Sequence, residues 1–357
     1  AGFGYDAGMS ILTFEECYVP RMWGGDSLGR IYGKPLPDEP IGEAWLISDH
    51  AQHTSVANRG AEAGATLRDL LERDALGILG SRAALTVHGQ FPLLLKLLDA
   101  RDKLSIQVHP NDAIAADLSE DDVGKTEMWY VLHADAGATL YCGMPEDMTR
   151  EAVEGCLAEG GISERLTRIG AEAGMSVFVP AGTVHAIGEG CLLAEIQQNS
   201  DLTYRIDDWG RVDVDGSPRE LHLEKSKASV RYPNVHPGAM PDFAYEVEGA
   251  RVRVLAACAY FAAEEIMLEG RCGESNRGET FQILLAKEGE VLVETGDDSV
   301  RLAPGEAAMV SGDDGDFSLS GRGSVLMYYV PDLEGNVVGP LLGAGYTRED
   351  LSVLLSQ

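Results

Sequence analysis

The clearest indication of the fold lies in residues 174–185, which read Gly174-Met-Ser-Val-Phe-Val-Pro180-Ala-Gly182-Thr-Val-His185. Residues 175–179 form a short apolar run that predicts a β-strand, and Pro180 ends it because proline cannot donate a ladder hydrogen bond. Gly182 permits the backbone conformations of a tight turn. The turn would direct His185 towards the interior of a β-structure, so this segment ties the course of the backbone to the position of one imidazole.

A strand further upstream offers polar side chains on one face. Residues 105–109, Ser-Ile-Gln-Val-His, alternate between polar and apolar, so Gln107 and His109 point the same way. Glu127 stands at the head of the next predicted strand, and an antiparallel barrel can bring all these side chains to His185. Two imidazoles, a carboxylate and an amide oxygen suit zinc or another divalent first-row ion. The alternative, two ordinary buried histidines, is disfavoured because the carboxylate and the turn motif accompany them.

Strands dominate the rest of the chain, and helices are inserted between them. The segment Thr66-Leu-Arg-Asp69 is a capping box that predicts the start of a helix, and apolar residues recur with helical spacing over 148–157. A further helix is predicted over 163–169. After a linker rich in proline and glycine, residues 233–241, alternating strands and turns predict a second antiparallel barrel or sandwich.

The composition predicts two domains, or one domain with an elaborate insertion, and no membrane segment. The chain has 357 residues, more than one average domain holds. It contains no apolar run of about 18 residues, the length at which a membrane span becomes an expectation. Residues 1–10 are rich in glycine and lack the charged and apolar regions of a secretory signal. Six scattered cysteines without a C-x-x-C pair fit reduced thiols, so we expect a cytoplasmic protein.

The charge of the chain restricts its partners. The formal net charge is −30. Nucleic-acid binding requires a basic surface, so nucleic acid is not an expected partner. An anionic surface also repels anionic metabolites, so a phosphorylated substrate would need cations gathered at its binding site. Lys96 is a candidate for such a cation, because it lies inside the apolar run 91–98, where a charge without a function or a partner is costly.

Several sequence motifs of this chain, taken in order, resemble those of a known protein family. The segments around Gln107 and His185 match the two cupin motifs, with Gln107 where many cupins have histidine. The chain as a whole resembles the type I mannose-6-phosphate isomerases in their shorter bacterial form, most clearly over residues 14–226. The motifs that carry this resemblance are Trp23-Gly-Gly25, Ile41-Gly-Glu-Ala-Trp45, Ser48-Asp-His50, Phe91-Pro-Leu-Leu-Leu-Lys-Leu-Leu-Asp99, Leu104-Ser-Ile-Gln-Val-His-Pro-Asn-Asp112, Gly124-Lys-Thr-Glu-Met-Trp-Tyr130, Val179-Pro-Ala-Gly-Thr-Val-His-Ala-Ile187, Glu195-Ile-Gln-Gln-Asn-Ser-Asp201, Tyr204-Arg205 and Glu220-Leu-His-Leu-Glu-Lys225.

The resemblance implies a fold, a reaction and a site. The fold would be mainly β, with two cupin-type (jelly-roll) β-barrels and inserted α-helices. The enzyme would interconvert mannose 6-phosphate and fructose 6-phosphate, with one zinc ion per chain. The implied zinc ligands are Gln107, His109, Glu127 and His185, the implied active-site arginine is Arg205, and the implied lysines facing the sugar phosphate are Lys96 and Lys125. The family usually has glutamate where this chain has Leu46. The polar contact that such a glutamate would make near the pocket wall is therefore not expected here.

The predicted domains differ in what they bind. A catalytic, metal-binding cupin domain is predicted over residues 10–234, a degenerate cupin-like barrel over 235–334, and a tail with a short helix over 335–357. The second barrel is expected to bind no metal, because no histidine follows His236. Apolar side chains are expected to fill its interior, namely Phe281, Leu284, Leu292, Met309 and Met327.

Other functions fit the same sequence less well. A non-catalytic sugar-phosphate sensor would not need a complete ligand set with three cations beside it, whereas an isomerase for a related phosphosugar would share all of these residues. An iron-dependent cupin dioxygenase is disfavoured because Gln107 stands in place of a histidine. The base that moves a proton between C1 and C2 stays open, because Glu195, Asp207 and a lysine are all chemically suitable.

Overall fold

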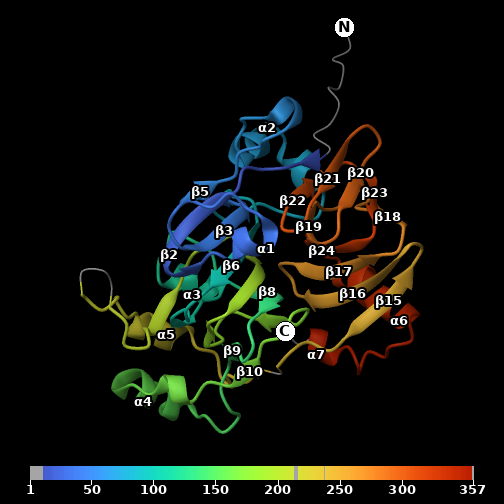
Figure 1. The fold of residues 1–357 in the computed structure, drawn as a ribbon. Helices are drawn as coiled ribbons and strands as arrows, with labels where there is room; N and C mark the ends of the chain where they lie inside the picture. Colours follow the sequence, from blue (N-terminus) through green and yellow to red (C-terminus); the bar gives the residue numbers. More distant parts are fainter. Residues whose placement is uncertain (1–10, 213–215, 237, 356–357) are drawn as a thin grey trace. The chain divides into compact units, whose positions relative to one another are not determined.

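The computed structural model describes residues 11–212, 216–236 and 238–355, and they form two compact units (Figure 1). The first unit contains the described residues up to Cys17, the segment Leu46–Leu94 and the described residues from Pro241 onward. The second unit contains Tyr18–Trp45 and Leu95–Met240. Residues 46–94, which the predicted domain limits place with the catalytic domain, therefore group with the C-terminal part of the chain.

Two antiparallel sheets make the second unit. The strand order of the first sheet is β11 (Ser176–Val179), β8 (Glu127–Ala134), β13 (Cys191–Gln198), β6 (Leu93–Ala100), β2 (Cys17–Gly25), β3 (Ile41–Ile47). The strand order of the second sheet is β10 (Arg168–Gly170), β9 (Thr139–Cys142), β12 (His185–Ile187), β7 (Ile106–Val108), β14 (Tyr204–Asp207). Both sheets contribute buried apolar side chains to one core, which includes Trp129 and Val131 from the first sheet and Leu140 and Ile187 from the second. The two sheets end in edge strands, so they form a cupin-type sandwich and not a fully closed barrel.

Short helices connect the strands of this unit. They are α1 (Ser27–Tyr32), α3 (Asp112–Asp117), α4 (Arg150–Glu159) and α5 (Leu223–Ser229). The helical spacing over 148–157 correctly predicts α4, whose first turn is capped by the Thr149 side chain. The helix predicted over 163–169 is wrong. Residues Ile162–Glu164 make a single 3₁₀ turn, and Arg168–Gly170 pairs as strand β10 with β9, a partner that local spacing does not reveal.

The first unit is also built from two antiparallel sheets. One has the order β1 (Ile11–Leu12), β22 (Ala307–Val310), β19 (Gln282–Glu288), β24 (Gly323–Tyr329), β17 (Ala262–Leu268), β16 (Ala250–Ala257), β15 (Phe243–Val247), and the other has β18 (Arg271–Ser275), β23 (Asp316–Gly321), β20 (Val291–Glu294), β21 (Ser299–Leu302). A hairpin of β4 (Asp49–His50) and β5 (His53–Thr54) precedes helix α2 (Leu67–Leu79). The chain continues past β24 into a π-helical turn (Leu333–Val338), α6 (Gly339–Gly343) and α7 (Ser352–Leu355). The mainly β fold with inserted helices is thus confirmed.

Local predictions hold well in the first unit. Thr66 and Asp69 form the predicted capping box at the start of α2. Four of the five predicted core residues of the C-terminal sheets are buried, namely Phe281, Leu284, Met309 and Met327. Leu292 is the exception, because its neighbours Val291 and Val293 are the buried residues of β20. Side chains alternate along a strand, so a register error of one residue exchanges the two faces.

No helix within the described ranges has the length and apolarity that crossing a membrane requires. All six cysteines are free thiols, as their scattered positions predict.

One carboxyl group lies buried inside the first unit. Glu264 on β17 is buried, and its Oε1 accepts a hydrogen bond from the Tyr329 hydroxyl at 2.9 Å. Burial, with a further contribution from Glu274, raises the pKa of Glu264 to about 8. The folded chain therefore keeps this group protonated at pH 7, and the interior of the unit is not wholly apolar.

We expect Glu264 to make the free energy of unfolding fall as the pH rises. Its pKa is about 8 in the folded chain against an ordinary value of 4.5, so between these values unfolding releases a proton. The stabilising contribution is complete below pH 4.5 and is lost as the pH rises through the folded value, with a slope of at most about 1.4 kcal/mol per pH unit. Urea unfolding of the parent and of Glu264→Gln at several pH values measures it. A stability difference between the two that does not change with pH would contradict the assignment.

Candidate active site and metal centre

Three potential ligands converge inside the second unit. His109 directly follows β7, Glu127 is the first residue of β8, and His185 is the first residue of β12. His109 Nε2 lies 3.4 Å from Glu127 Oε2, and His185 Nε2 lies 3.4 Å from Glu127 Oε1. All three side chains are buried, and one ligand atom from each lies within 4.8 Å of the others. The predicted convergence of these residues is therefore present.

Gln107 lies next to this cluster. It pairs with His185 across β7 and β12, and its Nε2 is 3.3 Å from His185 Nε2. Turning the amide by half a rotation would present Oε1 to the same point, because the two ends of the group differ only in donor and acceptor character. The alternation of residues 105–109 thus correctly predicts that the Gln107 side chain points towards the cluster.

The protein atoms around the cluster fit a divalent cation. His109 Nδ1 donates to the carbonyl oxygen of Leu202 at 2.6 Å, and His185 Nδ1 donates to that of Thr183 at 2.8 Å. Each Nε2 is then left with a lone pair that faces the Glu127 carboxylate. Among the described residues, His109 Nε2 is a buried polar atom without a hydrogen bond, and Glu127 Oε2 is paired with Lys125 Nζ at 2.9 Å. Lone pairs and a carboxylate that face one another in a buried site match the donor set of a metal centre.

The protonation states also suit metal binding. Burial lowers the pKa of His185 to about 3 and, together with Lys125, lowers the pKa of His109. Both rings are therefore neutral at pH 7. Burial alone would raise the pKa of Glu127, but Lys125 and the two histidines outweigh it and hold this pKa well below its ordinary value. Two neutral imidazoles and one carboxylate are the forms in which these groups bind metals.

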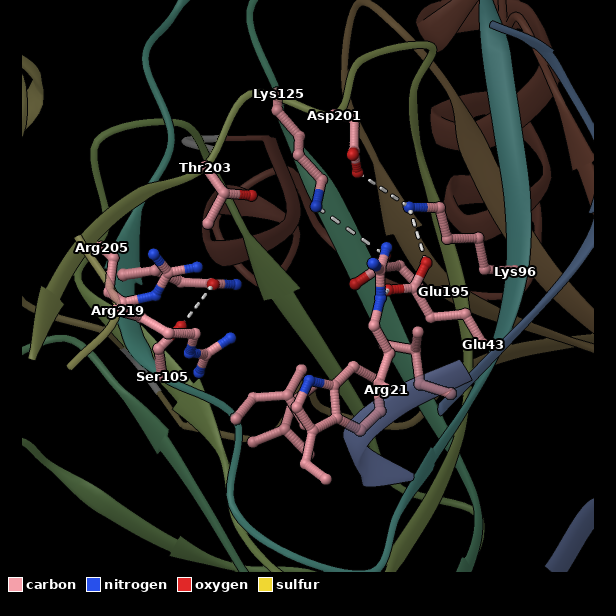
Figure 2. A pocket seen from close by; sticks show the side chains of 15 residues that line it. Arg21, Glu43, Lys96, Ser105, Lys125, Glu195, Asp201, Thr203, Arg205 and Arg219 are labelled. Atoms are coloured by element: carbon pink, nitrogen blue, oxygen red, sulfur yellow. Dashed lines mark hydrogen bonds and ion pairs between the residues drawn. The ribbon is translucent and has the colours of Figure 1, made fainter. Parts of the chain in front are cut away.

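Gln107 also lines a cavity of about 280 Å³ in the second unit (Figure 2). Charged side chains dominate its wall. They are Arg21, Glu43, Lys96, Lys125, Glu195, Asp201, Arg205 and Arg219. All three cations predicted for the site, Lys96, Lys125 and Arg205, are among them. The cavity thus gathers positive charge inside a chain whose net charge is −30.

Both lysines of the cavity are buried and ion-paired. Lys96 Nζ lies 3.3 Å from Asp201 Oδ1 and 3.4 Å from Glu43 Oε2. Lys125 Nζ lies 2.9 Å from Glu127 Oε2 and 3.9 Å from Glu195 Oε1. Burial alone would lower the pKa of Lys125, but these carboxylates raise it, so the lysine stays charged. Lys96, the lysine inside the apolar run 91–98, thus has the charged partners that its burial requires.

Arg205 lies on β14. In the pairing of β14 with β7, it stands opposite Gln107. Its Nη1 donates to the carbonyl oxygen of Glu220 at 2.8 Å. Its Nε is a buried donor without a hydrogen bond among the described residues. Burial, and after it the nearby Arg219, lower the pKa of Arg205, whereas Asp208 and Glu220 act in the opposite direction.

Only one of the two carboxylates considered as a base lies at the cavity. Glu195 lines it, and the indole Nε1 of Trp129 donates to Glu195 Oε2 and to Glu127 Oε1, each at 3.0 Å. Burial and the charge of Glu127 raise the pKa of Glu195 to about 7. Asp207 is not part of the cavity wall and accepts a hydrogen bond from the backbone N–H of Trp209 at 2.6 Å.

Four charged residues of the cavity were not predicted as site residues. They are Arg21, Glu43, Asp201 and Arg219. Glu43 carries the clearest signal in the sequence, because it is a carboxylate within the apolar strand Ile41–Ile47. Arg21 pairs with this carboxylate at 2.7 Å. Arg219 lies in a loop with no periodic pattern, so only the folded chain shows where it points.

A cupin-type sandwich with a buried His–Glu–His cluster beside a cationic cavity defines the class of metal-dependent cupin enzymes. Residues 11–131 match the family model of the type I phosphomannose isomerase catalytic domain, and residues 252–330 match that of the mannose-6-phosphate isomerase cupin domain. The chain belongs to the type I mannose-6-phosphate isomerase family, and it is an enzyme of that family.

Individual relatives support this membership. Mannose-6-phosphate isomerase ManA of Bacillus subtilis (strain 168) is 34% identical over 322 residues, which covers 89% of this chain and 98% of that protein. The mannose-6-phosphate isomerase of Streptococcus mutans is 42% identical over 208 residues, or 58% of this chain and 63% of that protein. A crystal structure of the mannose 6-phosphate isomerase from Bacillus subtilis matches with a TM-score of 0.80 at 30% identity, covering 90% of this chain and 99% of that one.

Proposed function

We propose that the chain interconverts mannose 6-phosphate and fructose 6-phosphate. The observation that carries this proposal is the buried cluster of His109, Glu127 and His185 beside a cavity that contains Lys96, Lys125 and Arg205. The family relatives named above share this activity in their names. A non-catalytic sensor has no need of a metal cluster next to its anion site, so the combination favours the enzyme.

We propose that Gln107, His109, Glu127 and His185 hold one zinc ion per chain. Two imidazoles and a carboxylate are ligands that zinc prefers, and the amide oxygen of Gln107 would complete four positions. When bound, the ion supplies positive charge that stabilises the negative charge developing on a sugar oxygen. The C-terminal sheets are proposed to bind no metal, because they contain no histidine.

The residues of the cavity have separate tasks in this proposal. Isomerisation moves a proton between C1 and C2, which requires a base inside the cavity. Glu195 fits this task by position, because it is a buried carboxyl group on the cavity wall, whereas Asp207 is not part of that wall. Lys125, 3.9 Å from Glu195, would stabilise charge on the enediol oxygens, and Arg205 would hold two oxygens of an anionic group by parallel hydrogen bonds.

The proposal also covers the binding partners of the enzyme and its cellular location. A sugar phosphate is the expected partner, and the net charge of −30 makes nucleic acid an unsuitable one. Reduced thiols fit a cytoplasmic location.

A coupled assay on mannose 6-phosphate, with metal analysis of the same preparation, tests the function. We expect turnover and about one zinc ion per chain. Tight binding of the sugar phosphate without turnover would support the sensor instead. Turnover confined to another phosphosugar would support a related isomerase, and two tightly bound ions per chain would contradict a metal-free C-terminal unit.

A further inference from the structure

We propose that Asn234 and His236 form a clamp that holds His185 in position for the metal ion. Both residues lie in the segment 233–241, whose proline and glycine content predicts only a linker. Neither is a proposed metal ligand, so both would act by positioning the turn that carries His185. This role rests on the proposed function, because it requires the metal centre of that proposal.

The turn over residues 180–184 is tied to the other segments that carry metal ligands. The backbone N–H of Gly182 donates to the carbonyl oxygen of His109 at 2.8 Å. The backbone N–H of Ala181 donates to the hydroxyl oxygen of Thr126 at 3.3 Å, and Thr126 directly precedes the carboxylate residue of the cluster. A shift of this turn would therefore change the position of one ligand relative to the other two.

Asn234 fixes this turn with both ends of its amide group. The residue is only 3% exposed. Its Oδ1 accepts a hydrogen bond from the backbone N–H of Val184 at 3.1 Å, and its Nδ2 donates to the carbonyl oxygen of Gly182 at 2.7 Å. Nδ2 also donates to the carbonyl oxygen of Arg231 at 3.2 Å. Because Val184 directly precedes His185, the amide holds the backbone at the point where the ligand leaves the turn.

The main chain around the clamp packs closely against its neighbours. The backbone N–H of Met144 donates to the carbonyl oxygen of Asn234 at 2.6 Å. Gly143 has a φ of 70°, and a Cβ there would lie 2.8 Å from the same carbonyl oxygen. Gly182 has a φ of 83°, and a Cβ there would lie 2.9 Å from the carbonyl oxygen of Ser229. Glycine at both positions thus permits the close approach of the two segments.

His236 holds the strand that leads into the turn. Its buried ring donates from Nε2 to the carbonyl oxygen of Phe178 in β11, and its Nδ1 accepts from the backbone N–H of Gly238 at 2.9 Å. Burial lowers the pKa of His236, so the neutral ring that these two bonds require is the form present at pH 7. The backbone N–H of Met240 donates to the carbonyl oxygen of Ser176 at 3.1 Å. Because β11 is an edge strand, these contacts occupy its free side.

The two residues therefore hold the turn at both ends. His236 fixes β11 before the turn, and Asn234 fixes Val184 after it. The ring of His185 is oriented by its bond to the carbonyl oxygen of Thr183, which belongs to the same turn. Groups that orient a metal ligand raise the affinity of the site. A turn that is fixed in advance also reduces the conformational entropy that is lost when the ion binds.

The zinc affinity of the full chain, measured by competition with a chelator, tests Asn234. We expect Asn234→Ala to weaken zinc binding about tenfold or more, as the loss of a group that orients a ligand does in other metal sites. Asn276→Ala is the matched control. Asn276 is also 3% exposed, makes three hydrogen bonds to backbone groups through its amide, and lies in the first unit. Equal zinc affinities in the two variants would overturn the role of Asn234.

Cobalt in place of zinc reports the geometry of the site. The visible absorption of bound Co²⁺ depends on the number and arrangement of its ligands. We expect a changed spectrum in Asn234→Ala at saturating cobalt and the spectrum of the parent in Asn276→Ala. A purely structural role would lower the free energy of unfolding in both variants and leave both spectra unchanged, and that result would contradict the positioning role.

A conservative replacement tests His236. His236→Leu removes the donor to Phe178, whereas the side-chain amide of His236→Gln can donate to the same carbonyl oxygen. We expect His236→Leu to weaken zinc binding about fivefold, and His236→Gln to stay within about twofold of the parent. Equal zinc affinities in these two variants would overturn the role of His236. This pair decides the matter even where Asn234→Ala does not fold.

The clamp and the proposed function can fail separately. A chain that loses zinc affinity in Asn234→Ala but not in Asn276→Ala, and does not isomerise mannose 6-phosphate, would end the proposed function and leave the clamp. A chain that isomerises normally, with equal zinc affinities in the two variants, would do the reverse.

Discussion

Replacing His185 with alanine should remove the bound metal and abolish isomerisation together. His185 is buried, its Nδ1 is fixed by the Thr183 carbonyl, and its Nε2 faces Glu127. Without the ring, three ligands at most are left, in a buried place where another side chain cannot substitute. We expect metal affinity to fall on the order of 100-fold or more and activity to fall to the limit of detection.

Elemental analysis and the coupled assay on the same samples measure both effects. His133→Ala is the control, because that histidine lies in the same unit and its side chain is 39% exposed. It should keep metal and activity. Chelation of the parent should reproduce the His185→Ala result, and added zinc should restore the parent but not the variant. Full activity in a metal-free His185→Ala sample would falsify the proposed metal centre.

Arg205→Ala should lower turnover strongly without loss of metal. Arg205 lies at the cavity and is not among the converging ligands, so its removal leaves the cluster of His109, Glu127 and His185 intact. The loss of a preorganised guanidinium costs about 100-fold in kcat/KM, because the charge it stabilises then loses one of its fixed donors. The metal content should stay near one ion per chain, since guanidinium is not a ligand.

Paired measurements of kcat/KM and metal content decide this prediction. Arg165→Ala should behave like the parent in both, because this arginine is exposed and lies outside the cavity wall. Normal turnover in Arg205→Ala would remove Arg205 from the proposed machinery. Loss of metal together with turnover would instead show that the variant disturbs the fold of the cluster.

The sequence predicted those parts of the site that local geometry controls. Gln107 and His109 share a strand face because side chains alternate, and His185 follows a turn that Pro180 and Gly182 specify. These residues do converge with Glu127 in the folded chain. The mainly β fold with inserted helices followed from the same alternation and from capping boxes such as Thr66–Asp69.

The parts that depend on distant partners could not be predicted in the same way. Strand β10 lies within a segment predicted as helix, because only its pairing with β9 makes Arg168–Gly170 extended. Leu292 was placed in the core because hydrophobicity alone does not fix the register of a short strand. Arg219 reaches the cavity from a loop with no periodicity, so no pattern in the sequence places it there.

The pairing of β1 with β22 affects how the chain folds during its synthesis on the ribosome. Ile11 lies opposite Val310, so β1 is synthesised long before its partner strand. At ordinary rates of synthesis, β1 waits roughly 15–60 s before β22 exists. The segment Leu46–Leu94 faces a similar delay, because most of its compact unit follows Pro241. The first unit therefore completes only after β22 has been made, and its early strands are the part of the nascent chain that chaperones would need to shield.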